Sequence, residues 1–162
     1  MKIAVSACLL GEACRYDGRS KPCAHVQELR ADGHELVPIC PEVAGGLPTP
    51  RTPCEIVQAP WMESGKVRAA NERSWTILDA SSTDRTAAYA RGAQAELARA
   101  KEAGCELAIL KAKSPSCGSG EVYDGTFSGT LVPGWGIAAA AFRDAGIAVI
   151  DETADFSRLA NG

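Results

Sequence analysis

Three short apolar runs in this chain are each followed by a cysteine, and this pattern limits the possible folds. Ile3-Ala-Val-Ser-Ala leads into Cys8, and Glu35-Leu-Val-Pro-Ile leads into Cys40. The third run, Leu107 to Leu110, continues into a Ser-Pro-Ser-Cys-Gly segment that contains Cys117. Continuous apolar runs of this length are typical of strands that are buried on both faces of a sheet. The sequence therefore predicts three buried strands, each with a thiol near its carboxyl end.

Helical segments separate these strands, which predicts an α/β fold. The predicted helices run from Ala24 to Ala31, from Thr83 or Asp84 to about Ala103 with Gly104 as the stop, and from Gly134 to Ala145, before a last strand at 147–150. This alternation favours a Rossmann-like, mostly parallel sheet with helices on both faces. Such folds bind ligands outside the carboxyl ends of the strands. We therefore expect the site there, with Cys8, Cys40 and Cys117 close together.

Other parts of the chain have less regular patterns. Residues 41–51 and a glycine-rich stretch of roughly 20 residues up to Pro133 are predicted to be loops. A loop as long as the second is usually functional or disordered. Between them, three segments are candidates for short strands in a small hairpin: Cys54–Val57, Lys66–Arg68 and Trp75–Leu78.

Composition restricts the class of protein further. The 162 residues predict a single domain spanning 1–162, and the formal net charge of −3 disfavours an extended nucleic-acid surface. The sequence has no apolar run of about 18 residues, so we expect no membrane span. Residues 1–8 do not resemble an export signal, so we expect a cytoplasmic protein.

The chain has seven cysteines. In a cytoplasmic protein we do not expect them to form a framework of disulfides, because the cytoplasm keeps thiols reduced. Three convergent thiolates suit a soft metal or an iron–sulfur cluster, with a fourth ligand from Cys14 or a histidine, or with one metal position open. The alternative is that they pack as small hydrophobic side chains. The residues alone leave both interpretations open. We assign only the packing role to Cys23, Cys54 and Cys105.

Polar residues near the same predicted edge are candidates for chemistry. Glu42 follows Cys40 by two positions, where a carboxylate could act as a general base; the alternative is a solvated loop residue. Ser114 and Ser116 flank Pro115, where their hydroxyl groups could form hydrogen bonds within the site. The alternative is that they only stabilise an ordinary turn. Arg15 and Arg51 either bind an anion or are solvated. His25 and His34 are expected at the surface, away from the site.

Three motifs together resemble those of the TudS-type thiouracil desulfurase family. They are Ser6-Ala-Cys-Leu-Leu-Gly11 with Cys14-Arg-Tyr-Asp-Gly18, then Cys40-Pro-Glu-Val-Ala-Gly-Gly-Leu-Pro-Thr-Pro-Arg51, then Leu110-Lys-Ala-Lys-Ser-Pro-Ser-Cys-Gly118. Asp84-Arg-Thr86 and Gly92-Ala93 also fit the pattern. The resemblance spans roughly residues 3–150, although residues 58–80 match it poorly.

The resemblance implies a 4Fe-4S cluster with three cysteine ligands and one open iron, the ligands being Cys8, Cys40 and Cys117. It also implies that Glu42 and Ser114 act on the attacking water. Cys14 is then expected to lie behind the ligand cysteines without binding the cluster itself.

We expect Ser116, Gly118 and Arg51 to bind substrate. The implied reaction is a non-redox desulfuration of a thiolated pyrimidine, as base, nucleoside or nucleotide, to the oxo form with release of sulfide. The alternative is a non-catalytic metal- or cluster-binding module with a structural or sulfur-carrying role.

Overall fold

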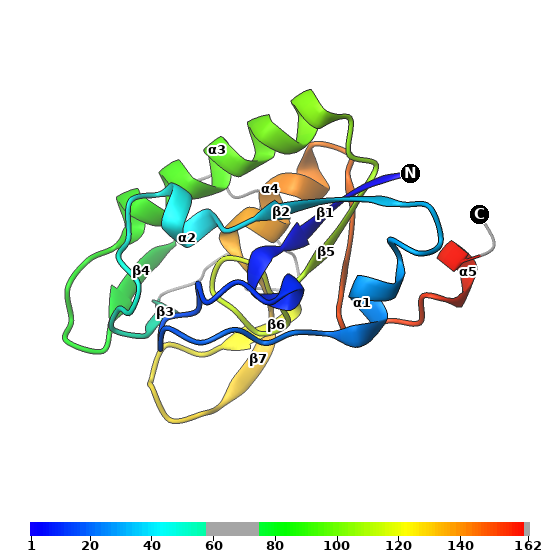
Figure 1. Cartoon of the computed structure of the whole chain (residues 1–162). Helices are drawn as coiled ribbons and strands as arrows, with labels where there is room; N and C mark the ends of the chain where they lie inside the picture. Colours follow the sequence, from blue (N-terminus) through cyan, green and yellow to red (C-terminus); the bar gives the residue numbers. More distant parts are fainter. Residues whose placement is uncertain (58–74, 161–162) are drawn as a thin grey trace.

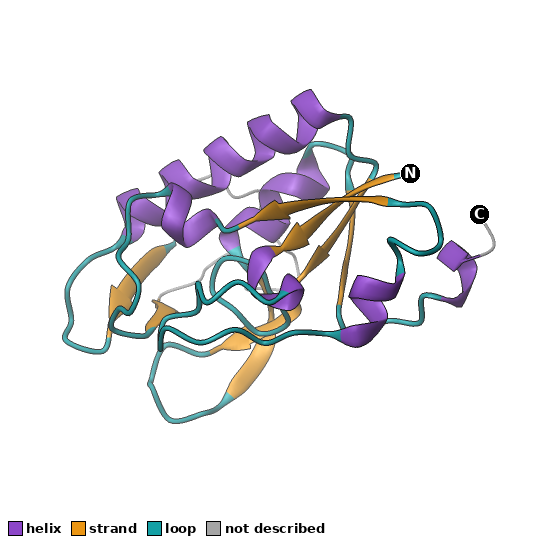
Figure 2. Ribbon diagram, in the orientation of Figure 1, coloured by secondary structure: helices purple, strands orange, loops and turns teal. Residues whose placement is uncertain are grey.

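The computed structural model describes residues 1–57 and 75–160 and contains a central four-stranded sheet, in which all the strands are parallel (Figures 1 and 2). The spatial order of the strands is β2-β1-β5-β8. Their bounds are β1 Lys2–Ser6, β2 Glu35–Ile39, β5 Leu107–Leu110 and β8 Ala148–Asp151. The edge position of β2 accommodates Pro38, because a proline has no N–H to donate to a neighbouring strand. The predicted α/β fold with a parallel sheet is confirmed.

Helices cover both faces of this sheet. The helical elements are a 3₁₀ turn η1 (Ala7–Leu10), α1 (Ala24–Glu28), α2 (Pro41–Ala44), α3 (Thr86–Ala103), α4 (Ile137–Asp144) and α5 (Ser157–Ala160). One core contains Ala108 and Leu110 with the small side chains of α3 and α4. The other contains Ile3 and Ile109, packed with η1 and α1. Side chains alternate between the two faces along each strand, so a continuous apolar run fills both cores. None of the described helices combines the length and the apolar character that crossing a bilayer requires.

The direction in which successive strands are added to the sheet reverses between β1 and β5, and a crevice for a ligand is expected at this point. The chain passes from β1 to its neighbour β2 on one side, then crosses to β5 on the other side of β1. At such a switch point, the loops that follow the two strands diverge and leave a crevice at the carboxyl edge of the sheet. Cys8 follows β1, Cys40 follows β2 and Cys117 follows β5, so all three thiols come to this edge.

Two antiparallel hairpins lie beside the central sheet, and one of them corrects the sequence analysis. β3 (Cys54–Val57) pairs with β4 (Thr76–Asp79), as expected for the small hairpin, while the expected strand at 66–68 lies outside the described residues. The stretch predicted as one long loop instead forms β6 (Ser119–Tyr123) and β7 (Leu131–Trp135). Its glycines and Pro133 obscured the strand pattern, because these residues normally interrupt strands.

Two other expectations were also wrong. The predicted loop 41–51 begins with the short helix α2, in which Pro41 occupies the first turn, a position that needs no N–H. His34 is buried, with its ring nitrogens bonded to the amino terminus (3.0 Å) and to Leu159 O (2.9 Å), and not exposed as expected. The partners of His34 come from the two ends of the chain, which a local pattern does not bring together.

Helices α2 and α3 approach so closely that only glycine fits between them. A Cβ on Gly92 would lie 1.6 Å from Pro41 O, and one on Gly45 would lie 2.0 Å from Ala88 O. Gly92 is buried in the middle of α3, where alanine would otherwise favour the helix. The contact holds α2, and with it Cys40 and Glu42, against the long helix.

Substitution of Gly92 tests this close approach. Gly92→Ala is expected to lower the free energy of unfolding by about 1–3 kcal/mol, because the added methyl group overpacks the contact with Pro41 O. The measurement is denaturant unfolding. The matched control is Ala95→Gly on the exposed side of α3, which should cost only the helix-propensity difference of about 1 kcal/mol. A Gly92→Ala variant as stable as the parent would contradict the close packing.

Candidate functional site

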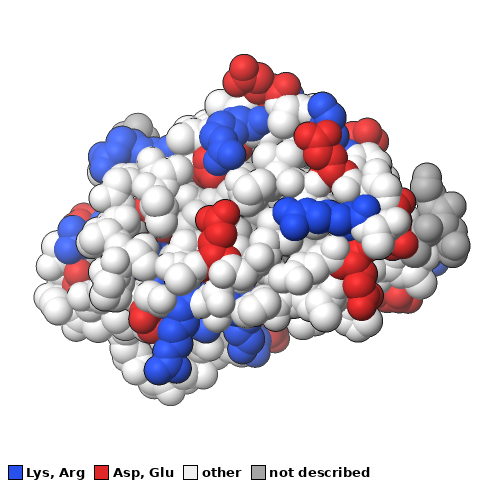
Figure 3. Space-filling view, viewed as in Figure 1, with Lys and Arg blue, Asp and Glu red and all other residues white. Residues whose placement is uncertain are grey.

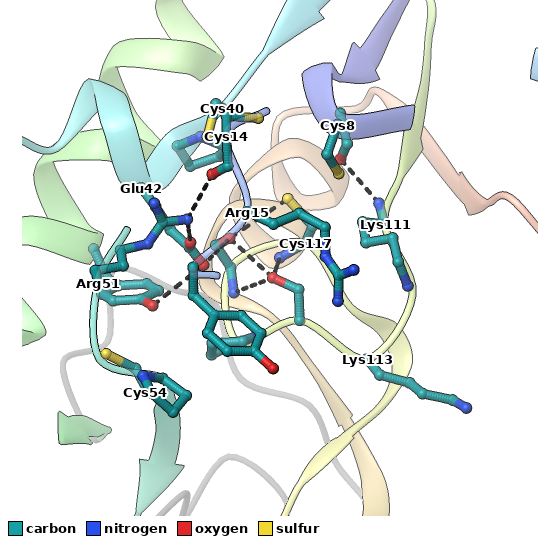
Figure 4. Close-up of a pocket in the computed structure, with 18 of the residues that line it drawn as sticks. Cys8, Cys14, Arg15, Cys40, Glu42, Arg51, Cys54, Lys111, Lys113 and Cys117 are labelled. Atoms are coloured by element: carbon teal, nitrogen blue, oxygen red, sulfur yellow. Dashed lines mark hydrogen bonds and ion pairs between the residues drawn. The ribbon is translucent and has the colours of Figure 1, made fainter. Parts of the chain in front are cut away.

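A cavity of about 590 Å³ lies at the carboxyl edge of the sheet (Figure 4). Its walls come from the segments that follow β1, β2 and β5, from the loop at residues 14–21, from residues 51–55, and from the β6–β7 hairpin. The cavity is therefore built from segments far apart in the sequence, at the position expected for a ligand in this fold. It contains thiols, carboxylates, cations and aromatic rings together.

The three predicted cysteines all line this cavity. Cys8 lies in η1 and is buried, Cys40 precedes α2 and is partly buried, and Cys117 is buried in the loop after β5. Among the described residues, no three Cys, His, Asp or Glu side chains are grouped so that they could hold a metal ion. The thiols thus share a cavity without meeting at a single point.

Cys14 and Cys54 also line the cavity, and sequence reasoning underestimated both. The Cys14 thiol interacts with the thiols of Cys40 and Cys8, so it lies among the proposed ligands and not behind them (Figure 4). Cys54, which was assigned only to packing, begins β3 at the rim. Neither position has a pattern that signals it, because both depend on how loops fold back over the sheet edge.

Burial and mutual contact raise the pKa values of Cys14, Cys40 and Cys117, which favours the protonated thiol at these three positions. Burial raises the pKa of the Cys117 thiol to about 12. The hydrogen bond with Cys40 lowers the pKa of Cys14, but the hydrogen bond with Cys8 and burial outweigh it and raise that pKa to about 11. The hydrogen bond with Cys14, together with burial, raises the pKa of Cys40 above its ordinary range. Since the thiolate is the metal ligand, any metal bound here must displace protons.

Glu42 and Arg51 form an ion pair beside the thiols. The side chains are only 13% and 5% exposed, and Arg51 Nη2 donates to Glu42 Oε2. The same Nη2 donates to Cys14 O at 2.9 Å, and the Arg51 backbone N donates to Tyr16 O at 2.7 Å. Burial disfavours the Arg51 charge, but the Glu42 carboxylate outweighs it and raises the pKa of the guanidinium. Arg51, which is predicted to bind substrate, holds the general-base candidate and the Cys14 loop together.

The other oxygen of Glu42 faces two hydroxyl groups. Tyr89 of α3 donates to Glu42 Oε1 at 3.2 Å, and burial, followed by the charge of Glu42, raises the pKa of the Tyr89 phenol so that it remains a donor. Ser116 Oγ lies 3.3 Å from the same Oε1 and 3.5 Å from Cys117 Sγ. Ser116 is only 2% exposed. A single hydroxyl group therefore connects the carboxylate to a buried thiol.

The Ser-Pro-Ser-Cys turn orders the thiol after β5. Ser114 Oγ accepts hydrogen bonds from the backbone N–H groups of Ser116 and Cys117, both at 3.1 Å, and contacts Ser116 Oγ at 3.1 Å. Ser114 thus shapes the turn, and Ser116 is the serine that contacts Glu42. Gly118, expected to bind substrate, is buried, where a Cβ would come within 2.8 Å of Ser114 O and Glu121 O. Its observed contacts serve packing.

Glu96 is a further residue that sequence reasoning missed. This buried carboxylate of α3 accepts the backbone N–H of Cys40 at 2.8 Å and pairs with Arg99 at 2.8 Å. Tyr89 and Glu96 are seven residues apart, two helical turns, so both lie on the buried face of α3. The sequence did contain a signal for Glu96, because it is a charged residue on a helical face whose other residues are mostly small and apolar.

Some of the charged side chains around the cavity are paired and others are not. Lys111 Nζ bonds Glu152 at 2.9 Å, whereas Lys113 is exposed and points away from the thiols (Figure 4). On the face shown in Figure 3, basic and acidic side chains are interspersed, in agreement with the small net charge.

Fold and site together define an α/β protein with a cavity lined by thiols and a carboxylate at the carboxyl edge of a parallel sheet. The chain belongs to the 2-thiouracil desulfurase family, whose model matches residues 3–154. A curated relative is the uncharacterized protein YbbK of Bacillus subtilis (strain 168), which is 42% identical over 150 residues that cover 93% of this chain and 95% of YbbK.

A solved structure of similar fold is the [4Fe-4S]-dependent thiouracil desulfidase TudS. Its TM-score is 0.77 at 41% identity, over 94% of this chain and 91% of that chain. The predicted family is therefore confirmed.

Substitution of Arg51 tests the buried ion pair. Arg51→Met is expected to lower the free energy of unfolding by about 3–5 kcal/mol, because it leaves the largely buried Glu42 carboxylate without its cation. The same substitution in a Glu42→Gln background should cost clearly less, since no buried charge is then left unpaired. Denaturant unfolding of the four proteins measures the difference as a double-mutant cycle. Equal costs in both backgrounds would show that the pair is not coupled.

Proposed function

We propose that this protein is an iron–sulfur-dependent desulfurase that converts a thiolated pyrimidine into its oxo form without net electron transfer. Thiouracil is the substrate class, as the free base or within a nucleoside or nucleotide. Family membership and the likeness to a [4Fe-4S]-dependent desulfidase support this proposal. In the site, one observation carries it: Glu42 Oε1 lies 3.3 Å from Ser116 Oγ, which lies 3.5 Å from Cys117 Sγ. A carboxylate base is thus next to a buried thiol.

The residues present fit a 4Fe-4S cluster. Cys8, Cys40 and Cys117 supply soft thiolate donors from three different loops around one cavity, and such donors suit iron–sulfur clusters. A cluster occupies the space between its ligands, so thiols that share a cavity without meeting at one point suit it. We assign these three as the ligands, with one iron left open, and Glu96 fixes the backbone of Cys40.

When bound, the cluster would supply a Lewis acid that draws electron density from the thiocarbonyl carbon. The chain's own residues direct water. Glu42 accepts a proton from the attacking water through Oε1, and Ser116 and Tyr89 orient that oxygen. Arg51 holds Oε2, so the carboxylate cannot rotate away.

The overall reaction balances as thiocarbonyl plus water giving carbonyl plus hydrogen sulfide. Water forms the new C–O bond, the C–S bond breaks, and the two protons of water leave with the sulfide. No oxidant or reductant is consumed. The Glu42 carboxylate and the hydroxyl groups of Ser116 and Tyr89 position the water. The apolar part of the cavity accommodates the pyrimidine ring.

Anaerobic purification tests the cofactor and the activity in one sample. The proposal expects the broad visible absorption of an iron–sulfur protein, iron and inorganic sulfide in equal amounts, and conversion of 4-thiouracil to uracil. The same sample should be analysed for zinc. Zinc alone, or a fully reconstituted cluster without desulfuration, would overturn the proposed function and favour a non-catalytic module.

Substitution of a ligand cysteine should abolish the cluster. Cys117→Ala is expected to lose the visible absorption and the iron, because its thiolate is one of three ligands, and activity should fall to background. The matched control is Cys105→Ala, which removes a buried cysteine that packs in the core instead of lining the cavity. This control should retain iron and activity. Full iron content in Cys117→Ala would remove Cys117 from the ligand set.

Substitution of the general base should separate cluster binding from turnover. Glu42→Gln can still accept hydrogen bonds from Tyr89 and Ser116, so the cluster should remain. Turnover of 4-thiouracil should fall by roughly 10²–10⁴-fold, the usual contribution of a positioned general base. Absorption spectra and iron analysis check the first expectation, and steady-state kinetics check the second. Desulfuration at the parent rate would exclude Glu42 as the base.

A further inference from the structure

Two exposed aromatic side chains stand out at the cavity. Large apolar side chains are exposed at four described positions, Met1, Tyr16, Val43 and Phe127, and two of them, Tyr16 and Phe127, line the cavity. Phe127 is 40% exposed at the tip of the β6–β7 hairpin. An exposed phenyl ring costs hydrophobic free energy, so its position in a ligand cavity suggests a contact with the ligand.

The backbone of Phe127 is strained. Its φ is +56°, in the left-handed region that non-glycine residues rarely adopt. Strain of this kind persists only where the surrounding structure enforces it, and it gathers at functional sites. A glycine would be more favourable at this position, yet the chain places a bulky aromatic residue here.

Glu55 of β3 enforces this conformation. Its Oε1 accepts the backbone N–H of Gly125 at 3.0 Å and that of Phe127 at 3.2 Å. Gly125 lies so close to β3 that a Cβ would meet Ile56 O at 2.7 Å. The hairpin tip is therefore held against β3 at Gly125 and Phe127, and both Glu55 and Phe127 line the cavity.

The polar side chains of the tip bond with one another. Thr126 Oγ1 contacts Asp124 Oδ1 and Ser128 Oγ, both at 2.6 Å, and Ser128 Oγ contacts Thr130 Oγ1 at 2.8 Å. This hydroxyl network stiffens the turn. Phe127 is the apolar residue of this tip, and its side chain forms part of the cavity wall. A stiff tip keeps the phenyl ring in that position.

We infer that Phe127 forms one face of the pyrimidine subsite and selects planar heteroaromatic thiones by stacking on their rings. Glu55 is the positioning residue that holds this face in place. The inference rests on the proposed function, because it assumes that the ligand of the cavity is the thiolated pyrimidine. A flat ring gains from stacking on an aromatic side chain, whereas a non-aromatic thiocarbonyl compound such as thioacetamide does not.

Phe127→Gly is the decisive variant. Glycine relieves the left-handed strain, so the melting temperature should stay the same or rise, whereas a merely structural role for Phe127 would lower it. The KM for 4-thiouracil should rise by roughly 5- to 100-fold, the factor expected when one base–aromatic stack is lost, with a much smaller change in kcat. The preference for 4-thiouracil over thioacetamide should fall by a similar factor. Phe127→Tyr should restore the parent KM.

Two further variants complete the kinetic test. Glu55→Ala should raise KM in the same direction, and Glu55→Ala combined with Phe127→Gly should be no worse than Phe127→Gly alone, because Glu55 acts through Phe127. Glu121→Ala, an exposed position of β6 in the same hairpin, is the matched control and should keep the parent KM. An unchanged KM in Phe127→Gly, or additive effects of the two substitutions, would overturn the inference.

Equilibrium dialysis of uracil, the product, gives a readout independent of turnover. The affinity for uracil should weaken in Phe127→Gly by a factor similar to that in KM, while the visible absorption and iron content stay at the parent level. Cluster-loaded parent protein that binds uracil but does not desulfurate would overturn the proposed function and leave the stacking inference to be decided by the dialysis alone. Equal uracil affinity in parent and variant, or no uracil binding by the parent, would overturn the inference.

Discussion

The site depends on the close contact between the backbones of α2 and α3. Gly45 and Gly92 allow carbonyl oxygens of the opposite helix to lie where side chains would normally stand. This contact places the four-residue helix α2, too short to be stable by itself, on the side of the eighteen-residue helix α3. Cys40 and Glu42 take their positions from α2, so the geometry of thiol and carboxylate follows from a packing contact between two glycines.

Around that contact, buried polar groups are satisfied by partners from different segments. Glu42 takes hydrogen bonds from Arg51, Tyr89 and Ser116, which lie in a loop, in α3 and after β5. Glu96, two turns further along α3 than Tyr89, accepts a hydrogen bond from the backbone N–H of Cys40. A buried carboxylate is tolerated only when it is paired and hydrogen-bonded, and each partner also fixes its orientation. The same interactions that stabilise the largely buried Glu42 carboxylate therefore also fix its orientation.

The β6–β7 hairpin gives the cavity a wall that the central sheet does not supply. Parallel strands end in loops at one edge, and such loops are open to solvent unless another element covers them. Gly125 and Glu55 fix the hairpin tip to β3, and Phe127 faces the cavity as a result. The apolar wall at Phe127 and the polar wall at Glu42 thus belong to different parts of the chain.

The sequence by itself determined the α/β class, the parallel strands and the arrival of Cys8, Cys40 and Cys117 at one edge, because apolar runs and the carboxyl ends of strands are local features. Its three motifs also identified the family. The tertiary structure decided which groups face the carboxylate, why Arg51 holds Glu42, and that Cys14 lies among the thiols.

The tertiary structure alone also revealed Tyr89 and Glu96 as partners at the site, and Phe127 as a wall of the cavity. These contacts join residues tens of positions apart. They arise from packing between α2 and α3 and from the docking of a hairpin on β3. The periodicity of a sequence specifies which face of an element is buried, but the contact between two buried faces depends on their distance and angle in three dimensions.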